Sequence, residues 1–168
     1  MEKLTSRKTT RLRGADYDSA CVIFLTICTK NKRCTLSQIV GTGVLDGPQI
    51  QLLQYGKIAD KYINQLNDFY KDISVENYVI MPNHIHMILW LKGEGGGPSR
   101  TPVPTMQNNA VARFVSTFKR FCNKECGENI WQYRSYDHIV RNREDYEKHI
   151  KYIHDNPMNW YYDELYGQ

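Results

Sequence analysis

Residues 73–91 read ISVENYVIMPNHIHMILWL, two apolar runs separated by a Pro-Asn pair. β-Branched, aromatic and other apolar residues fill both runs, which is typical of strands, and a Pro-Asn pair between such runs indicates a turn. We therefore expect one strand that ends near Met81 and a second from about His84 to Leu91, most simply paired as a hairpin.

The sequence before this hairpin predicts a strand, a loop region and a helix. The run CVIFLTIC at 21–28 is β-branched and aromatic, which indicates a buried strand. Residues 39–53 mix glycines and a proline with short apolar pieces, so we expect a loop with one or two short strands. From 54 to 70 the apolar residues fall on one helical face, which predicts the first helix.

Three more elements follow the hairpin. Apolar residues at helical spacing predict a helix over 106–126, and the aromatic-rich segment 131–140 indicates a further strand. Asn142 is a typical N-cap for a short helix over 143–156, which Pro157 ends because the residue before a proline disfavours helical geometry. The order strand, helix, two strands, helix, strand, helix favours an α+β sandwich, a sheet with helices on one face.

The length of 168 residues suits one domain with segments of different composition around it. We expect a polar, basic arm over 1–16, a single domain over 17–160 and a tail over 161–168. Glycine and proline dominate 93–105, which indicates a flexible internal loop. The five cysteines form no CxxC pair, so we expect neither a zinc ribbon nor a disulfide framework.

The net charge of +4 is concentrated in two basic clusters. Such clusters favour an anionic polymer as partner, although ordinary solvated surface explains them about equally well. No apolar run could span a bilayer and the N-terminus lacks the apolar segment of a secretory signal, so we expect a cytoplasmic protein without membrane contact. The candidate polymer contacts are Arg11 and Arg13 in the arm and Arg113, Lys119, Arg120 and Lys124 in the helix over 106–126.

His84 and His86 form the first candidate chemical site. Residues two apart on a strand point the same way, so both imidazoles project from one face and could share a metal ion. Two unrelated polar residues on a solvated strand would be the simpler explanation for most such pairs. Here the flanking residues are apolar, and burying two unpaired imidazoles is costly. The pair therefore favours a metal site that a ligand from elsewhere completes.

Tyr152 and Asn156 form the second candidate pair, one turn apart on the predicted helix over 143–156. A phenol can attack phosphorus once its proton is lost, and an amide oxygen can bind a metal ion. On spacing alone, a core tyrosine and a helix-ending asparagine are the better explanation, since the chain contains 12 tyrosines.

Asp137 and His138 are adjacent in the predicted strand over 131–140, so they face opposite sides of it. One of them could support the site from behind its ligands while the other packs elsewhere. A capping or buried polar role explains the pair at least as well.

The segments YVIMPNHIHMI, STFKR, YRSYDHIVRN and YIHDNP, in this order, resemble the REP-associated tyrosine transposases and the related single-tyrosine transposases of small insertion sequences. The resemblance runs from about Arg11 to Trp160. It implies the α+β fold of the HUH endonucleases, a ferredoxin-like antiparallel sheet with helices packed on it. It also implies that the two histidines lie on a central strand and that the nucleophile is on a C-terminal helix.

The resemblance further implies the roles of the site residues. Tyr152 would be the nucleophile, and His84, His86 and Asn156 would hold Mg²⁺ or Mn²⁺. Asn156 stands where the mobile-element enzymes carry glutamine, a longer side chain with the same amide oxygen. On ligand softness, two imidazoles suit Mn²⁺ better than Mg²⁺.

The activity implied by the resemblance is cleavage and strand transfer of single-stranded DNA beside a hairpin, through a 5′-phosphotyrosine intermediate. Mobile-element members act as dimers that exchange tyrosine helices and repeat-associated members resemble monomers, so a monomer and a homodimer both stay open. Two other functions stay open as well. One is a catalytically inactive DNA-binding protein derived from a transposase, and the other is a metal-dependent hydrolase that uses a bound water.

Overall fold

A four-stranded antiparallel sheet in the order β4-β5-β1-β6 forms the centre of the molecule. The computed structural model describes residues 21–41, 47–92 and 109–166. The predicted arm over 1–16, with Arg11 and Arg13, and the predicted loop over 93–105 lie outside these residues. The strands of the sheet are β1 (Cys21–Cys28), β4 (Ile73–Ile80), β5 (His84–Leu91) and β6 (Tyr136–Val140).

The predicted hairpin is confirmed, and its second strand is central. β5 pairs with β4 on one side and with β1 on the other, both antiparallel. At the turn between β4 and β5, the N–H of Met81 donates to the carbonyl of His84 at 2.8 Å. A separate two-stranded sheet of β2 (Ser37–Val40) and β3 (Gln49–Leu52) occupies the region where we expected one or two short strands.

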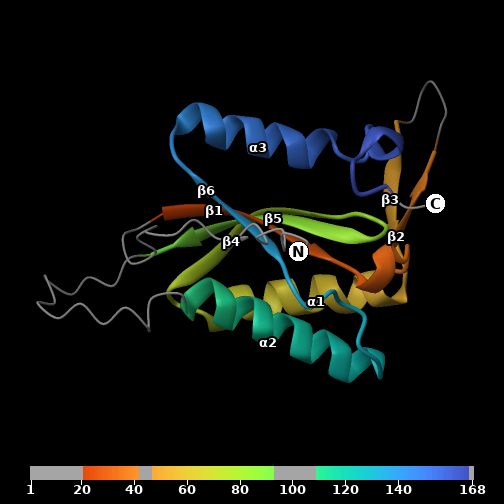
Figure 1. The fold of residues 1–168 in the computed structure, drawn as a ribbon, viewed down its shortest axis with the longest axis horizontal. Helices are drawn as coiled ribbons and strands as arrows, with labels where there is room; N and C mark the ends of the chain where they lie inside the picture. The colour runs from red at the N-terminus through yellow and green to blue at the C-terminus, as the bar shows by residue number, and fades with distance from the viewer. Residues whose placement is uncertain (1–20, 42–46, 93–108, 167–168) are drawn as a thin grey trace, which may run out of the picture.

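Helices cover both faces of the central sheet (Figure 1). α1 (Gln54–Phe69) and α2 (Asn109–Cys126) pack against each other on one face, and α3 (Arg143–Asp155) lies on the other. The expectation that all helices lie on one face is therefore wrong. The physical reason is that the sheet carries apolar side chains on both faces, so each face needs a cover that removes it from water.

Strand alternation divides the residues of β5 between these two faces. Ile85, Met87 and Leu89 belong to the apolar core beneath α1 and α2. His84 and His86 point the other way, toward α3, whose Tyr152 ring lies 5.1 Å from that of His86. The period of two along the strand thus separates the apolar set from the histidines.

α3 begins where the sequence predicted, because the Asn142 side chain accepts a hydrogen bond from the N–H of Asp145 at 2.8 Å. After α3 the chain turns back in a short 3₁₀ helix, η2 (Trp160–Tyr162). Trp160 is buried on the α3 face, and the Asn83 amide donates to the Leu165 carbonyl at 2.7 Å. The structure thus places the start of the predicted tail over 161–168, as far as residue 166, against the β4–β5 turn.

Within the described ranges, no helix combines the length and the apolar character that crossing a membrane requires.

Candidate metal and nucleophile site

His84 and His86 lie side by side on the α3 face, with ring centroids 4.4 Å apart, as their spacing predicted. Each ring is held through Nδ1: His84 Nδ1 lies 2.8 Å from Asn83 Oδ1, and His86 Nδ1 lies 2.8 Å from Thr26 Oγ1. Among the described residues, neither Nε2 atom has a hydrogen-bond partner, although both are buried. Rings anchored through one nitrogen present the other to an ion, the usual arrangement of metal-binding histidines.

Burial also keeps both imidazoles neutral. It lowers the pKa of His84 to about 4, against the opposing negative charge of Asp163. It lowers the pKa of His86 well below its ordinary value, and the neighbouring His84 ring adds to this effect. At pH 7 both rings are therefore in the neutral form that binds metal ions.

Asn156 reaches the same point from the C-terminal end of α3. Its Nδ2 donates to Asp163 Oδ2 at 3.0 Å, while its Oδ1 is buried and has no hydrogen-bond partner in the described part of the chain. Asp163 Oδ2 lies 4.0 Å from His84 Nε2, and the ligand atoms of His84, His86 and Asp163 all lie within 4.8 Å of one another. Two imidazole nitrogens and a carboxylate oxygen therefore converge, and the Asn156 amide is hydrogen-bonded to that carboxylate.

This donor set fits a divalent ion. Buried polar atoms are almost always paired, so three unpaired ones at one place need an explanation. The three are His84 Nε2, His86 Nε2 and Asn156 Oδ1. A metal ion would satisfy all three at once, and the mixed nitrogen and oxygen set is one that Mn²⁺ accepts.

Asp163 is the site residue that sequence reasoning missed. It lies seven residues beyond Asn156, in the segment we assigned to a tail. No helical or strand period links the two residues, because the chain reverses through Pro157 and η2 between them. Its presence at the site follows only from the tertiary fold, which brings Asp163 Oδ2 to 4.0 Å from His84 Nε2 on β5.

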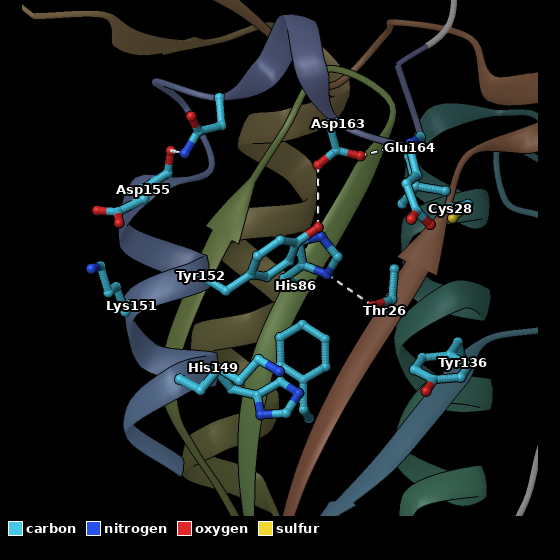
Figure 2. A pocket seen from close by; sticks show the side chains of 14 residues that line it. Thr26, Cys28, His86, Tyr136, His149, Lys151, Tyr152, Asp155, Asp163 and Glu164 are labelled. Atoms are coloured by element: carbon cyan, nitrogen blue, oxygen red, sulfur yellow. Dashed lines mark hydrogen bonds between the residues drawn. The ribbon is translucent and has the colours of Figure 1, made fainter. Parts of the chain in front are cut away.

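Tyr152 lies over His86, with its hydroxyl directed at Asp163 (Figure 2). Tyr152 Oη donates to Asp163 Oδ2 at 3.3 Å, and the residue is 44% exposed and lines a cleft. Burial of the ring, together with the charge of Asp163, raises the pKa of Tyr152 to about 12. Such a phenol needs a nearby positive charge to lose its proton at neutral pH.

A cleft of about 760 Å³ opens beside Tyr152. Residues from β1, β5, β6, α3 and the C-terminal segment line it (Figure 2). The residues that line it include Tyr136, which is 53% exposed, and the basic residues Lys148 and Lys151. An exposed aromatic residue and lysines along one cleft suit a flexible, negatively charged chain.

Asp137 and His138 do point to opposite sides of β6. His138 faces α3, where its Nε2 lies 2.9 Å from Asp145 Oδ2. Asp137 is buried and pairs in register with Leu25 of β1, whose side chain belongs to the core beneath α1 and α2. His138 is thus tied to the first turns of α3, and Asp137 lies on the face away from the cleft.

The basic residues of α2 lie on the face of the sheet opposite the cleft (Figure 1). Arg113 Nη2 pairs with Asp72 Oδ2 at 2.6 Å. Lys119 Nζ donates to the Gln132 carbonyl at 2.8 Å, and burial lowers its pKa to about 8. The structure therefore does not bring the four predicted DNA contacts of α2 to the candidate site. These four are Arg113, Lys119, Arg120 and Lys124.

Comparisons with known proteins show which sequences and folds this chain is similar to. No family model matches the sequence. The chain is 28% identical over 173 residues to an uncharacterized protein of Haemophilus influenzae, a match that covers 95% of this chain and 93% of that protein. It is 30% identical over 136 residues to the REP-associated tyrosine transposase of Escherichia coli, covering 80% of this chain and 65% of the relative, slightly less than two thirds.

A solved structure of a REP-associated tyrosine transposase bound to a REP hairpin has a similar fold. The TM-score is 0.61 at 22% identity, and the match covers 89% of this chain and 73% of the solved one. The predicted α+β fold, an antiparallel sheet with helices packed on it, is thereby confirmed. In sequence the chain is similar to REP-associated tyrosine transposases, as its motifs indicated.

Proposed function

We propose that this protein is a metal-dependent endonuclease and strand transferase for single-stranded DNA, acting through a 5′-phosphotyrosine link on Tyr152. One observation carries the proposal: Tyr152 Oη lies beside a group of buried, metal-type ligand atoms, three of them without hydrogen-bond partners among the described residues. The homologue's name, and the hairpin in the solved structure, support DNA next to a hairpin as the substrate.

His84, His86 and Asn156 would hold Mg²⁺ or Mn²⁺, and Asp163 would be a further oxygen ligand. The bound ion would polarise the scissile phosphate and neutralise the charge that develops on it. Asp163 accepts the hydrogen bond of Tyr152 Oη. If Asp163 bound the ion, the negative charge beside the nucleophile would therefore be partly neutralised.

Tyr152 forms the new bond in the proposed reaction. Its Oη attacks phosphorus and the bond between phosphorus and the 3′ oxygen breaks. The phosphate then stays on the tyrosine as the 5′ end of one fragment. The departing oxygen becomes a 3′-hydroxyl, taking up through solvent the proton that the phenol loses. Because the phosphodiester energy is kept in the new bond, another 3′-hydroxyl can reverse the step and join strands without ATP.

The cleft would bind the strand on either side of the scissile phosphate. Tyr136 offers an exposed ring on the edge strand β6 for stacking against a base. Lys148 and Lys151 lie on α3 and would contact phosphates. These residues share the cleft with Tyr152, which supports a single path for the DNA.

A single chain would suffice for this activity, since Tyr152 and His86 of one chain already lie in ring contact. An equimolar mixture of the Tyr152→Phe and His86→Leu variants tests this inference. We expect no covalent product from the mixture. Restored activity would mean that chains exchange their tyrosine helices, which would support the dimer.

Incubation of the full chain with a hairpin oligonucleotide, labelled at its 3′ end, and Mn²⁺ tests the proposed function. We expect an SDS-resistant adduct that carries the label, and peptide mapping should locate it on Tyr152. Tyr152→Phe removes one oxygen and keeps the ring, so it should still bind DNA and form no adduct. Tyr146→Phe is the matched control, since this tyrosine lies on the same helix and interacts with Glu76 of β4.

The other outcomes separate the remaining functions. Undiminished cleavage by Tyr152→Phe without an adduct would support a hydrolase that uses a bound water. DNA binding without cleavage, in the presence of Mn²⁺, would support a DNA-binding protein without catalysis. An adduct on another tyrosine would overturn the assignment of the nucleophile.

A further inference from the structure

A second group of metal-binding side chains lies at the N-terminal half of α3, apart from the candidate site. It consists of His138 on β6 and Asp145 and His149 on α3, whose ligand atoms all lie within 4.8 Å of one another. We propose that these three residues bind a divalent transition-metal ion of the zinc class. The proposal does not depend on the proposed function, because it uses none of the residues assigned to cleavage.

The distances between the donor atoms are close to those of ligands to one ion. His138 Nε2 lies 2.9 Å from Asp145 Oδ2, and His149 Nδ1 lies 3.2 Å from Asp145 Oδ1. Two ligand bonds of about 2.1 Å in a tetrahedral site separate their donor atoms by about 3.4 Å, a few tenths of an ångström more than these contacts. An ion could therefore enter between the three side chains with little movement of any of them.

The donor types also suit such an ion. Two imidazoles and a carboxylate, with water in the open positions, form a common ligand set for zinc and its neighbours among the divalent metals. The side chains are 17–27% exposed, so water can reach the ion and complete its coordination.

The protons balance when the ion enters. In the structure as it stands, His149 Nδ1 donates its hydrogen to the Asp145 carbonyl at 2.7 Å, and the His138 ring bonds to the carboxylate. On binding, each imidazole presents to the ion the lone pair of the ring nitrogen that now faces Asp145, and a proton on that nitrogen moves to the other ring nitrogen or to solvent.

The backbone and the neighbouring rings hold the three ligands in place before any ion binds. Asp145 accepts from the Arg141 N–H at 3.1 Å, and the capping bond to its own N–H fixes its position in α3. The His138 and His149 rings are stacked, 4.9 Å apart at 25°, and His149 also rests on Phe24 at 4.4 Å. Little side-chain entropy remains to be lost on binding, which favours affinity.

An ion at this position would join β6 to the helix that carries Tyr152. His138 belongs to the edge strand, while Asp145 and His149 belong to α3. His149 also lines the cleft and precedes Tyr152 by three residues. Binding should therefore stabilise the wall of the cleft as well as the fold.

Zinc and cobalt binding to the full chain tests the proposal. In the double variant His84→Leu/His86→Leu, which lacks the imidazoles of the other site, we expect one equivalent of zinc in competition with a chromophoric chelator. We also expect visible absorption bands with Co²⁺. Adding His138→Gln should lower the zinc affinity by roughly 100-fold or more. His154→Gln is the matched control, because this histidine of α3 is 88% exposed and lies outside the cluster.

Two results would overturn the proposal. One is a double variant, folded by circular dichroism, that binds no zinc at concentrations that saturate the unmodified chain. The other is zinc binding that His138→Gln and Asp145→Asn both leave unchanged. Asp145→Asn keeps the size of the side chain, so it serves if His138→Gln fails to fold. Neither measurement uses DNA, so this proposal and the proposed function can fail separately.

Discussion

The two faces of the central sheet are built from the same strands and carry opposite kinds of side chain. On β5, Ile85 and Met87 are fully buried in an apolar core. His84 and His86 alternate with them and are 0% and 3% exposed, yet their Nε2 atoms have no hydrogen-bond partner within the described ranges. A sequence selected for stability alone would not bury two ring nitrogens without partners, so the α3 face carries a requirement other than stability.

The sizes of the two cores explain why the fold tolerates this requirement. In the described part of the chain, 21 buried residues form the core beneath α1 and α2, and six form the core beneath α3. Each unpaired buried polar group costs about 1–3 kcal/mol, a large share of the stability of an ordinary domain. The larger core offsets that cost, and the α3 face is free to hold a site.

Replacing a histidine of the α3 face should have the largest effect, and it should fall on activity. His86→Leu removes a ligand and an unpaired polar atom while keeping a similar volume. We expect adduct formation with Mn²⁺ to fall by on the order of 10³-fold or more, since a metal ion contributes several kcal/mol to the transition state. The free energy of unfolding in urea and EDTA should stay within about 1 kcal/mol of that of the unmodified chain. A strongly destabilised variant would show that the imidazole is structural.

Truncating Met87, the next residue of β5, on the face beneath α1 and α2 should instead lower stability and leave activity unchanged. Met87→Ala opens a cavity in the core beneath α1 and α2, and we expect a loss of about 2–5 kcal/mol in the free energy of unfolding. Adduct formation per folded molecule should be unchanged. Urea denaturation followed by circular dichroism measures the first quantity, and single-turnover labelling measures the second. A Met87→Ala variant that folds but forms no adduct would show that the two faces are not separable.

Low pH should destabilise the metal-free protein, because the buried histidine His84 on the α3 face is neutral in the folded state. The pKa of His84 is about 4 in the folded chain and 6.5 ordinarily, so the unfolded state takes up the proton first as pH falls. The contribution of His84 to the free energy of unfolding is complete above pH 6.5 and is lost as pH falls toward 4. The loss is on the order of 3 kcal/mol at most. Urea titrations in EDTA between pH 7.5 and 4 should show a slope that His84→Leu flattens. His154→Gln, at an exposed position, should keep the slope.

Removing the charge of Asp163 should make Tyr152 easier to ionise. Asp163→Asn should lower the pKa of Tyr152 from about 12 toward 10, but by less than this full interval, because burial is the larger cause of the shift. Phenolate absorbance, taken as the difference between Asp163→Asn and the same variant with Tyr152→Phe, isolates this group. An unchanged titration would mean that Asp163 does not affect the nucleophile in solution.

Charge reversal on the two faces should affect DNA binding unequally, and the α2 side should give the smallest effect of all. Lys148→Glu with Lys151→Glu should lower the salt dependence of binding to single-stranded DNA by about 1.4 in the log–log slope, at about 0.7 for each lost phosphate contact. Arg120→Glu with Lys124→Glu should change it less. Equal effects from both pairs would support the prediction from charge clustering that the basic helix contacts phosphates.

Local sequence patterns were enough to predict most of the helices and strands and the direction of many side chains within them. Period-two alternation placed His84 and His86 on one face of β5, and the helical period placed Tyr152 and Asn156 one turn apart on α3. Both patterns are local, because they depend only on the backbone geometry of a single element. The cap at Asn142 was predictable for the same reason.

Which helices and strands pack against one another follows from the tertiary structure and from no local pattern. Local periodicity says which side of its own helix a residue occupies, but not which face of the sheet that helix covers. The packing of distant segments decided that α3 covers the histidines while the basic residues of α2 lie on the far side. Chain reversal after Pro157 brought Asp163 to the site, and the approach of β6 to α3 joined His138 to Asp145. These contacts depend on where apolar surfaces far apart in the chain bury one another, which no short motif encodes.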